Sequence, residues 1–215
     1  ASQQRTATAQ AQGFFTHEII PVNIPQRKDD PIVVDTDEHP RASTTLEALA
    51  KLKPVVTAEG TVTAGNASGI NDGAAAVLIA SEQAIQQYQL KPRAKIIAST
   101  AVGVEPRIMG FAPAPAIKKL LKQANLTIEQ MDVIELNEAF AAQALAVTRD
   151  LGLADDTTQV NPNGGAIAIG HPLGASGARL VTTALNQLEQ TGGTYALCSM
   201  CIGVGQGIAM IIQRV

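Results

Sequence analysis

One histidine, His171, stands in a glycine-rich run between Val160 and Leu180, and Pro172 follows it directly. Glycine reaches backbone conformations that other residues avoid, and it lets a ligand come close to the main chain. A helix is predicted to begin near Ala175, and the partial positive charge at a helix N-terminus disfavours an imidazolium ion nearby. A neutral imidazole can accept a proton, so this setting favours a catalytic role for His171 over a structural one.

A second glycine-rich turn, from Gly203 to Gly207, follows Cys201, and the two turns together hold eight of the 18 glycines of the chain. A thiol with an ordinary pKa of about 8.5 needs only a small shift to exchange protons near neutrality. The amide groups of such a turn can also stabilise an oxyanion. A dinucleotide-binding loop is disfavoured, because that motif needs a helix directly after it and here a strand is predicted.

Cys198 and Cys201 have the C-x-x-C spacing of redox motifs. Such motifs normally open a helix in a βαβ unit, whereas Cys198 lies in a predicted strand. Positions three apart on a strand point to opposite faces of the sheet. We therefore expect Cys198 to be a buried core residue and Cys201 to be the reactive one.

Asn137 stands before Glu138-Ala139-Phe140 and has two interpretations. It can be the N-cap of a helix that begins at Glu138, which is a common role for asparagine. It can also hold a water or a substrate oxygen at the carboxyl edge of a sheet, where α/β proteins bind ligands. The sequence leaves both interpretations open.

Strands and helices alternate over the second half of the chain, which predicts an α/β layered domain with a mostly parallel sheet. Strands are predicted at residues 32–34, 74–80, 95–100, 133–136, 195–200 and 207–212, and helices at 2–12, 45–52, 82–90, 113–124, 138–151 and 175–190. The last two strands are joined by a short turn, so that pair is expected to be antiparallel.

Composition narrows the class of protein. The formal net charge is −3, which argues against a nucleic-acid binder, because such proteins usually carry a clustered basic surface. No apolar run approaches the roughly 18 residues of a membrane span. Two cysteines do not make a disulfide framework, so we expect a cytoplasmic protein. His17 and His39 lie apart from His171, and no metal site is expected.

Three short blocks, in this order, resemble the C-terminal signatures of thiolases. They are Asn137-Glu138-Ala139-Phe140, Gly170-His171-Pro172 and the C-x-G of Cys201 to Gly203. The run from Gly60 to Gly73 resembles the coenzyme A loop of the same family, so the resemblance extends over essentially the whole chain. Within the family, C-I-G-V-G-Q-G, with Val204 where thiolases usually have glycine, is similar to the β-ketoadipyl-CoA thiolases.

The resemblance implies an acyltransferase. A 3-oxoacyl-CoA, here 3-oxoadipyl-CoA, would be cleaved by coenzyme A to acetyl-CoA and succinyl-CoA through an acyl-cysteine. His171 would take the proton of the nucleophilic thiol, and Asn137 would orient a water in the first oxyanion hole. Cys201 would be the general acid and base, and the Gly203 amide would serve a second oxyanion hole.

The resemblance also implies how the substrate binds. Ala64 and Ser68 would line the pantetheine channel, Arg41 would meet a coenzyme A phosphate, and Phe140 would lie beside the substrate. Coenzyme A would be a substrate, with no permanently bound cofactor. The family suggests homodimers or tetramers.

By the same resemblance, the chain has an α-β-α-β-α layered fold in three parts: part of a loop domain (1–58), the last part of an N-terminal domain (59–93) and a complete C-terminal domain (94–215). The acylated cysteine of the family lies in an N-terminal half that this sequence does not contain. The first residues also read as the middle of a helix without an initiator methionine. We therefore expect a piece of a larger protein that has no turnover by itself.

Two other functions share these residues. A biosynthetic acetoacetyl-CoA thiolase would use all of them. A non-catalytic acyl-CoA-binding or lipid-binding member of the fold would need no acid–base pair, so the presence of Asn137, His171 and Cys201 together disfavours it.

Overall fold

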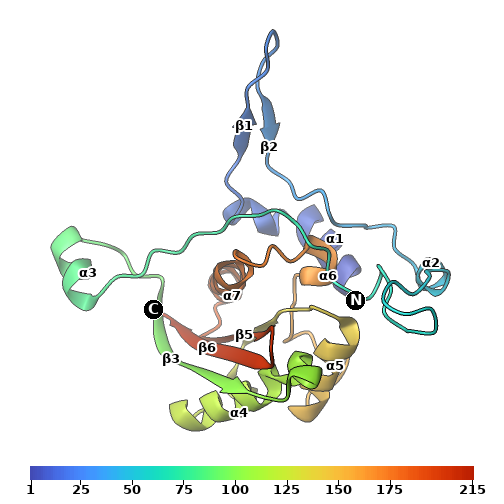
Figure 1. Ribbon diagram of the computed structural model, residues 1–215. Coiled ribbons are helices and arrows are strands. Elements are labelled where there is room, and N and C mark those ends of the chain that lie inside the picture. The colour runs from blue at the N-terminus through green and yellow to red at the C-terminus, as the bar shows by residue number, and fades with distance from the viewer.

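A four-stranded sheet in the order β3-β6-β5-β4 organises residues 94–215 (Figure 1). The structure is a computed structural model that describes residues 1–215. Its helices and strands are, in chain order, α1 (Ser2–Ala11), β1 (Val22–Ile24), β2 (Ile32–Val34), α2 (Leu46–Ala50), α3 (Glu82–Tyr88), β3 (Ala94–Gly103), α4 (Pro113–Ala124), β4 (Val133–Leu136), α5 (Ala141–Asp150), α6 (Ala166–Ile169), α7 (Ser176–Thr191), β5 (Tyr195–Ile202) and β6 (Gln206–Arg214).

The sheet is mixed, and the expectation that it is mostly parallel is wrong. β4 and β5 are parallel, whereas β5 pairs with β6 and β6 pairs with β3 in antiparallel fashion. The antiparallel β5–β6 pair is as expected from its short turn. The third pair differs because β3 lies beside the last strand of the chain and not beside β4, which follows it in sequence.

Helices cover both faces of this sheet (Figure 1). On one face, Leu180, Ala184 and Leu188 follow one another at helical spacing on α7 and pack in a buried cluster with Val133 and Cys198. Residues i and i+4 share one face of a helix, so this spacing directs a continuous apolar stripe at the strands. The described chain therefore forms three layers of the expected five-layered fold.

The opposite face carries the larger part of the core. Ile117 and Leu120 of α4 pack there with Ile134 of β4 and Val147 of α5, all at most 1% exposed. Prolines in the first turn of α4 replace amides that have no partner within the helix. Asn125 ends the helix in a left-handed conformation (φ 54°).

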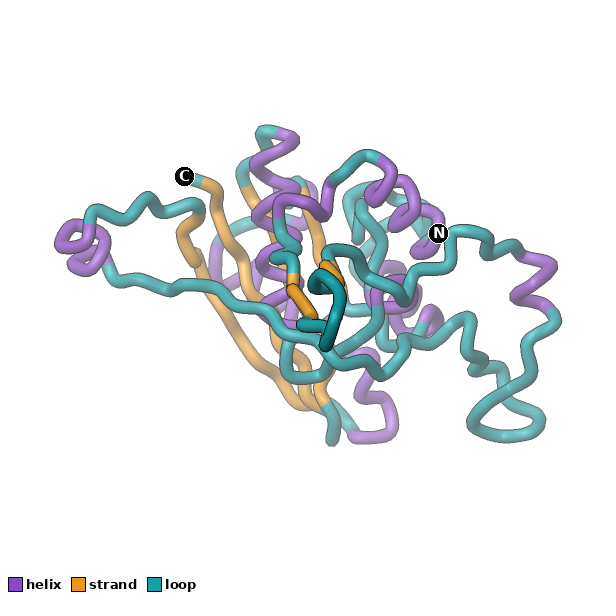
Figure 2. The backbone as a smooth tube through the Cα atoms, turned by 90° about the horizontal axis from the view of Figure 1, so that it is seen from above, coloured by secondary structure: helices purple, strands orange, loops and turns teal.

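Residues 18–93 follow a different plan. The β1–β2 hairpin projects away from the sheet, and long loops run from it to α2 and α3 (Figures 1 and 2). The expected strand at residues 74–80 is not formed. A strand needs a hydrogen-bonding partner, and Val77, Leu78 and Ile79 are instead 44%, 83% and 72% exposed.

None of the helices has the length and apolar character that crossing a membrane would require.

Candidate active site

Two of the three sequence blocks meet at one edge of the sheet. β4 and β5 are parallel, so their carboxyl ends lie together, with Asn137 just after β4 and Cys201 near the end of β5. The amide of Asn137 donates a hydrogen bond to the carbonyl of Ser199 at 3.0 Å. Parallel pairing therefore places Asn137 across from the residues that lead into Cys201.

Asn137 is not a helix cap. The helix that follows begins at Ala141, with Phe140 at the N-cap position, so the interpretation of Asn137 as an N-cap is wrong. The residue is fully buried, and its Nδ2 lies 3.3 Å from Nε2 of His171. Its Oδ1 has no hydrogen-bond partner within the protein.

The hydrogen bonds of His171 identify its tautomer. Nδ1 lies 2.6 Å from Oγ of Ser176, and that hydroxyl donates its hydrogen to the carbonyl of Pro172 at 3.0 Å. Ser176 must then accept from Nδ1–H, because a hydroxyl has only one hydrogen to donate. Nε2 of the neutral ring carries the lone pair and accepts from the Asn137 amide.

The pKa of His171 is lowered, which confirms that the ring favours its neutral form. Burial is the main cause, and the positive charge of Arg179 adds to it. A neutral ring with its lone pair on Nε2 can act as a general base.

The loop from Gly60 to Gly73 contacts the block around Asn137 and the block around His171. Ser68 donates its amide hydrogen to the Ala139 carbonyl at 3.0 Å, and the amide of His171 donates to the Gly69 carbonyl at 2.9 Å. Asn71 packs against Gly170, whose φ of +89° and close neighbour leave no room for a side chain. The structure thus brings the expected coenzyme A loop to the histidine.

Cys201 is 6% exposed. Burial raises the pKa of its thiol, which is a shift away from neutrality. Such a group holds its proton and is suited to donate it to a developing carbanion. Cys198 packs in the buried cluster against α7, as expected for a core residue.

The turn after Cys201 contains an unusual backbone conformation. Val204 has a φ of 60°, a region that β-branched residues rarely adopt, and its side chain is 78% exposed. Gly205 follows with a φ of 88°. Gly203 is exposed at the start of the turn.

The remaining expected binding residues lie at the periphery. Arg41 is exposed, and its backbone amide donates to the Gln3 side chain at 2.6 Å. Ala64 is exposed and Ser68 is half-buried, on the loop that contacts Ala139. Phe140 pairs with Ala67 in an isolated bridge, so it lies beside this loop.

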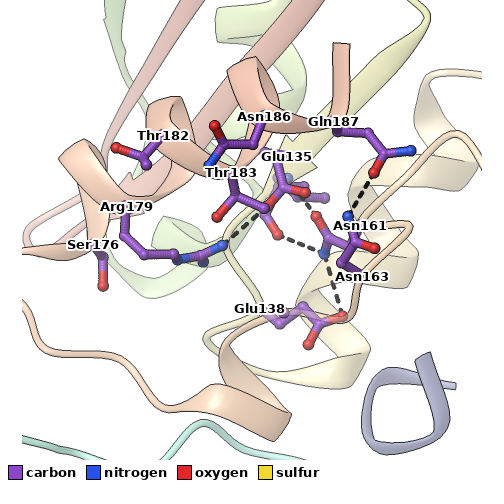
Figure 3. Close-up of polar contacts among 12 residues, drawn as sticks. Glu135, Glu138, Asn161, Asn163, Ser176, Arg179, Thr182, Thr183, Asn186 and Gln187 are labelled. Carbon is purple, nitrogen blue, oxygen red and sulfur yellow. Dashed lines mark hydrogen bonds and ion pairs between the residues drawn. The ribbon is translucent and has the colours of Figure 1, made fainter. Parts of the chain in front are cut away.

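Sequence reasoning missed two residues that hold the site in place. Ser176 stands at the start of α7, and its distance of five residues from His171 was the only signal. The Asn161 side chain accepts from the amide of Leu136 and donates to its carbonyl, both at 2.8 Å, and it also donates to Glu138 (Figure 3). Asn161 therefore extends the hydrogen bonding of β4 up to the residue before Asn137.

Comparisons with known proteins show which sequences this chain resembles. Residues 90–214 match the sequence model of the thiolase C-terminal domain, and residues 1–83 match that of the thiolase N-terminal domain. A β-ketoadipyl-CoA thiolase of Acinetobacter baylyi is 84% identical over 214 residues, which cover 100% of this chain and 53% of that protein.

Two solved structures are similar. A Bacillus anthracis acetyl-CoA acetyltransferase superposes with a TM-score of 0.94 at 42% identity, over 100% of this chain and 54% of that one. A human mitochondrial 3-ketoacyl-CoA thiolase in complex with CoA gives 0.89 at 45% identity, over 100% and 52%. The chain spans about half the length of the relatives that it matches.

Proposed function

The chain belongs to the thiolase family, and we propose that it forms the C-terminal part of a thiolase that cleaves 3-oxoadipyl-CoA with coenzyme A. The observation that carries the proposal is the buried pair of Asn137 and His171, with Nδ2 3.3 Å from Nε2. The 84% identity to a β-ketoadipyl-CoA thiolase supports the choice of substrate.

In the first half-reaction, Nε2 of His171 takes the proton of a nucleophilic cysteine thiol outside residues 1–215. The thiolate attacks the 3-oxo carbon, and the bond between C2 and C3 breaks. Acetyl-CoA leaves as a carbanion and takes a proton from the thiol of Cys201, while the succinyl group stays on the nucleophilic cysteine. The raised pKa of Cys201 supports this role, because it keeps the proton in place until the carbanion forms.

In the second half-reaction, the thiolate of Cys201 takes the proton of coenzyme A. The coenzyme A sulfur attacks the succinyl thioester, and the departing cysteine thiolate recovers its proton from His171. Both acid–base groups return to their starting states. Asn137 orients a water through its Oδ1, which no protein group occupies, and the Gly203 amide stabilises an oxyanion in the turn after Cys201.

Coenzyme A would lie along the loop of residues 60–73, with Ala64, Ser68 and Phe140 beside the pantetheine and Arg41 at a phosphate. The contact of Ser68 with Ala139 supports this path, because it seats the loop beside the catalytic edge. No other cofactor takes part. We further propose the division into residues 1–58, 59–93 and 94–215, assembly as a homodimer or tetramer, and a cytoplasmic location.

The decisive experiment compares thiolysis by the complete enzyme with thiolysis by the 215-residue chain. The complete enzyme should cleave 3-oxoadipyl-CoA with a higher kcat/KM than acetoacetyl-CoA, and the chain should show no turnover. A clear preference for acetoacetyl-CoA would instead identify a biosynthetic thiolase. Turnover by the chain would place the nucleophile within residues 1–215.

The variant His171→Ala of the complete enzyme separates the proposed thiolase from a non-catalytic acyl-CoA-binding protein, in which this histidine has no catalytic role. Loss of the general base should lower kcat by about 10²–10⁴-fold while coenzyme A still binds. Unchanged thiolysis in this variant would contradict the role proposed for His171.

A further inference from the structure

A largely buried ion pair joins Glu135 of β4 to Arg179 of α7 (Figure 3). Nη1 of Arg179, on α7, donates to Oε2 of Glu135, on β4, at 3.0 Å. The Glu135 side chain is 0% exposed and that of Arg179 is 18% exposed. None of the catalytic steps proposed above uses either residue.

The pair joins β4, which leads into Asn137, to α7, which carries the Ser176 that contacts His171. Side chains alternate along a strand, and Glu135 projects from the face of β4 that packs on α7; Asn137 comes two residues later, just past the end of β4. Arg179 follows Ser176 by three residues, nearly one helical turn. The link from Glu135 to Arg179 therefore runs parallel to the contacts of Asn137 with His171 and of His171 with Ser176.

This pair is a poor way to stabilise a core. Oε1 of Glu135 and Nη2 of Arg179 have no hydrogen-bond partner within the protein. Removing two charges from water costs several kcal/mol per ion, and well-packed apolar residues of similar volume are often about as stable or more so. An ion pair with two partnerless atoms is thus better explained by the geometry that it imposes.

Arg179 is the cation next to the candidate active site, because the charged groups around it are carboxylates. Burial raises the pKa of Glu135, and Arg179 opposes that rise. The Glu18 carboxylate accepts hydrogen bonds from Thr183 and Asn186 on α7, the helix that carries Arg179. The charge of Arg179 also acts on Asp37, where it opposes the rise in pKa that burial causes. Arg179 is the only charge that shifts the pKa of His171.

We propose that Glu135 and Arg179 are positioning residues, which fix the first turns of α7 against β4 and so set the distance between Asn137 and His171. This inference rests on the function proposed above. The alignment of Asn137 with His171 matters because a displacement of about 1 Å at a catalytic group can lower a rate by about 100-fold. Arg179 has a second effect, since its charge adds to the burial that lowers the pKa of His171.

The test uses three variants of the complete enzyme. Arg179→Met and the double variant Glu135→Met with Arg179→Met remove the link, and Glu135→Gln is the conservative control because its amide oxygen can still accept from Arg179. Each is measured for its melting temperature, for kcat, for KM of coenzyme A, and for the pH at which activity falls on the acid side.

Both variants without Arg179 should lose at least about tenfold in kcat, with KM within twofold and the acid limb moved to higher pH. The double variant should melt within a few degrees of the wild type, and Glu135→Gln should keep kcat within threefold. Wild-type kcat with an unmoved acid limb in either folded variant lacking Arg179 would overturn the proposal. His171→Ala in the same assay tests the proposed function separately, because an active His171→Ala enzyme would contradict that function whatever the ion pair does.

Discussion

Residues 112–215 and residues 18–93 place their apolar side chains in opposite ways. In the first region, side chains from three strands and three long helices close two buried clusters on themselves. In the second, no side chain is buried, and Leu78 and Ile79 are exposed. The difference shows that Asn137 and His171 are held by a core that is complete within the chain, whereas the loop that meets them is held mainly by backbone hydrogen bonds.

Removing a core side chain should show the largest effect. Leu188→Ala takes a fully buried side chain out of the cluster against α7 and should lower the free energy of unfolding of the 215-residue chain by about 2–5 kcal/mol. Leu78→Ala is the matched control in the exposed region and should change it by less than about 0.5 kcal/mol. Urea denaturation measures both. Equal losses would mean that the region around Leu78 is packed as tightly as the core.

The contact between the two regions can be broken at Gly170. Gly170→Ala forces a side chain into a left-handed backbone beside Asn71 and should destabilise the chain by about 1–3 kcal/mol. Because His171 is the next residue, kcat of the complete enzyme should fall as well. Gly174→Ala is the matched control, since no atom lies within 4 Å of its added carbon. Similar losses in the two variants would show that the turn tolerates any side chain.

A substitution at Val204, the left-handed residue in the turn after Cys201, should raise the free energy of unfolding where the two previous substitutions lower it. Val204→Gly should raise the free energy of unfolding by about 1 kcal/mol, because the relieved strain of a β-branched residue exceeds the added flexibility of glycine. Val102→Gly, in the ordinary conformation of β3, should instead lower it. Denaturation midpoints of the two variants provide the comparison. A loss of stability at Val204 equal to that at Val102 would remove the case for strain.

The smallest effect should be a pH dependence of stability from His171. Burial lowers its pKa in the folded protein, so the unfolded chain binds the proton first as the pH falls. Stability from this group is therefore complete above the unfolded pKa of about 6.5. It declines as the pH falls from there toward the lower folded-state value. Urea midpoints between pH 5 and 8 should drop less in His171→Gln than in the wild type, and parallel curves would show that His171 titrates normally.

Much of the fold was predictable from local patterns. The helix at residues 113–124 and the strand at 133–136 match their predicted ranges, because proline, left-handed asparagine and apolar spacing act within a few residues. The strand predicted at residues 74–80 failed because the pattern specifies an apolar extended segment but no partner strand.

The sequence by itself determined the family, because the blocks around Asn137, His171 and Cys201 stand in the order of its signatures, and it predicted which residues do the chemistry. Tertiary structure alone decided how they act. The tautomer of His171 depends on Ser176 and on Asn137, which is 34 residues away. Burial and contacts between distant segments also decide three other features. Asn137 is not a helix N-cap, the pKa of Cys201 is raised, and Glu135 is linked to Arg179. Spacing along a chain reports local backbone preferences, whereas burial and partners exist only once the strands and helices have packed.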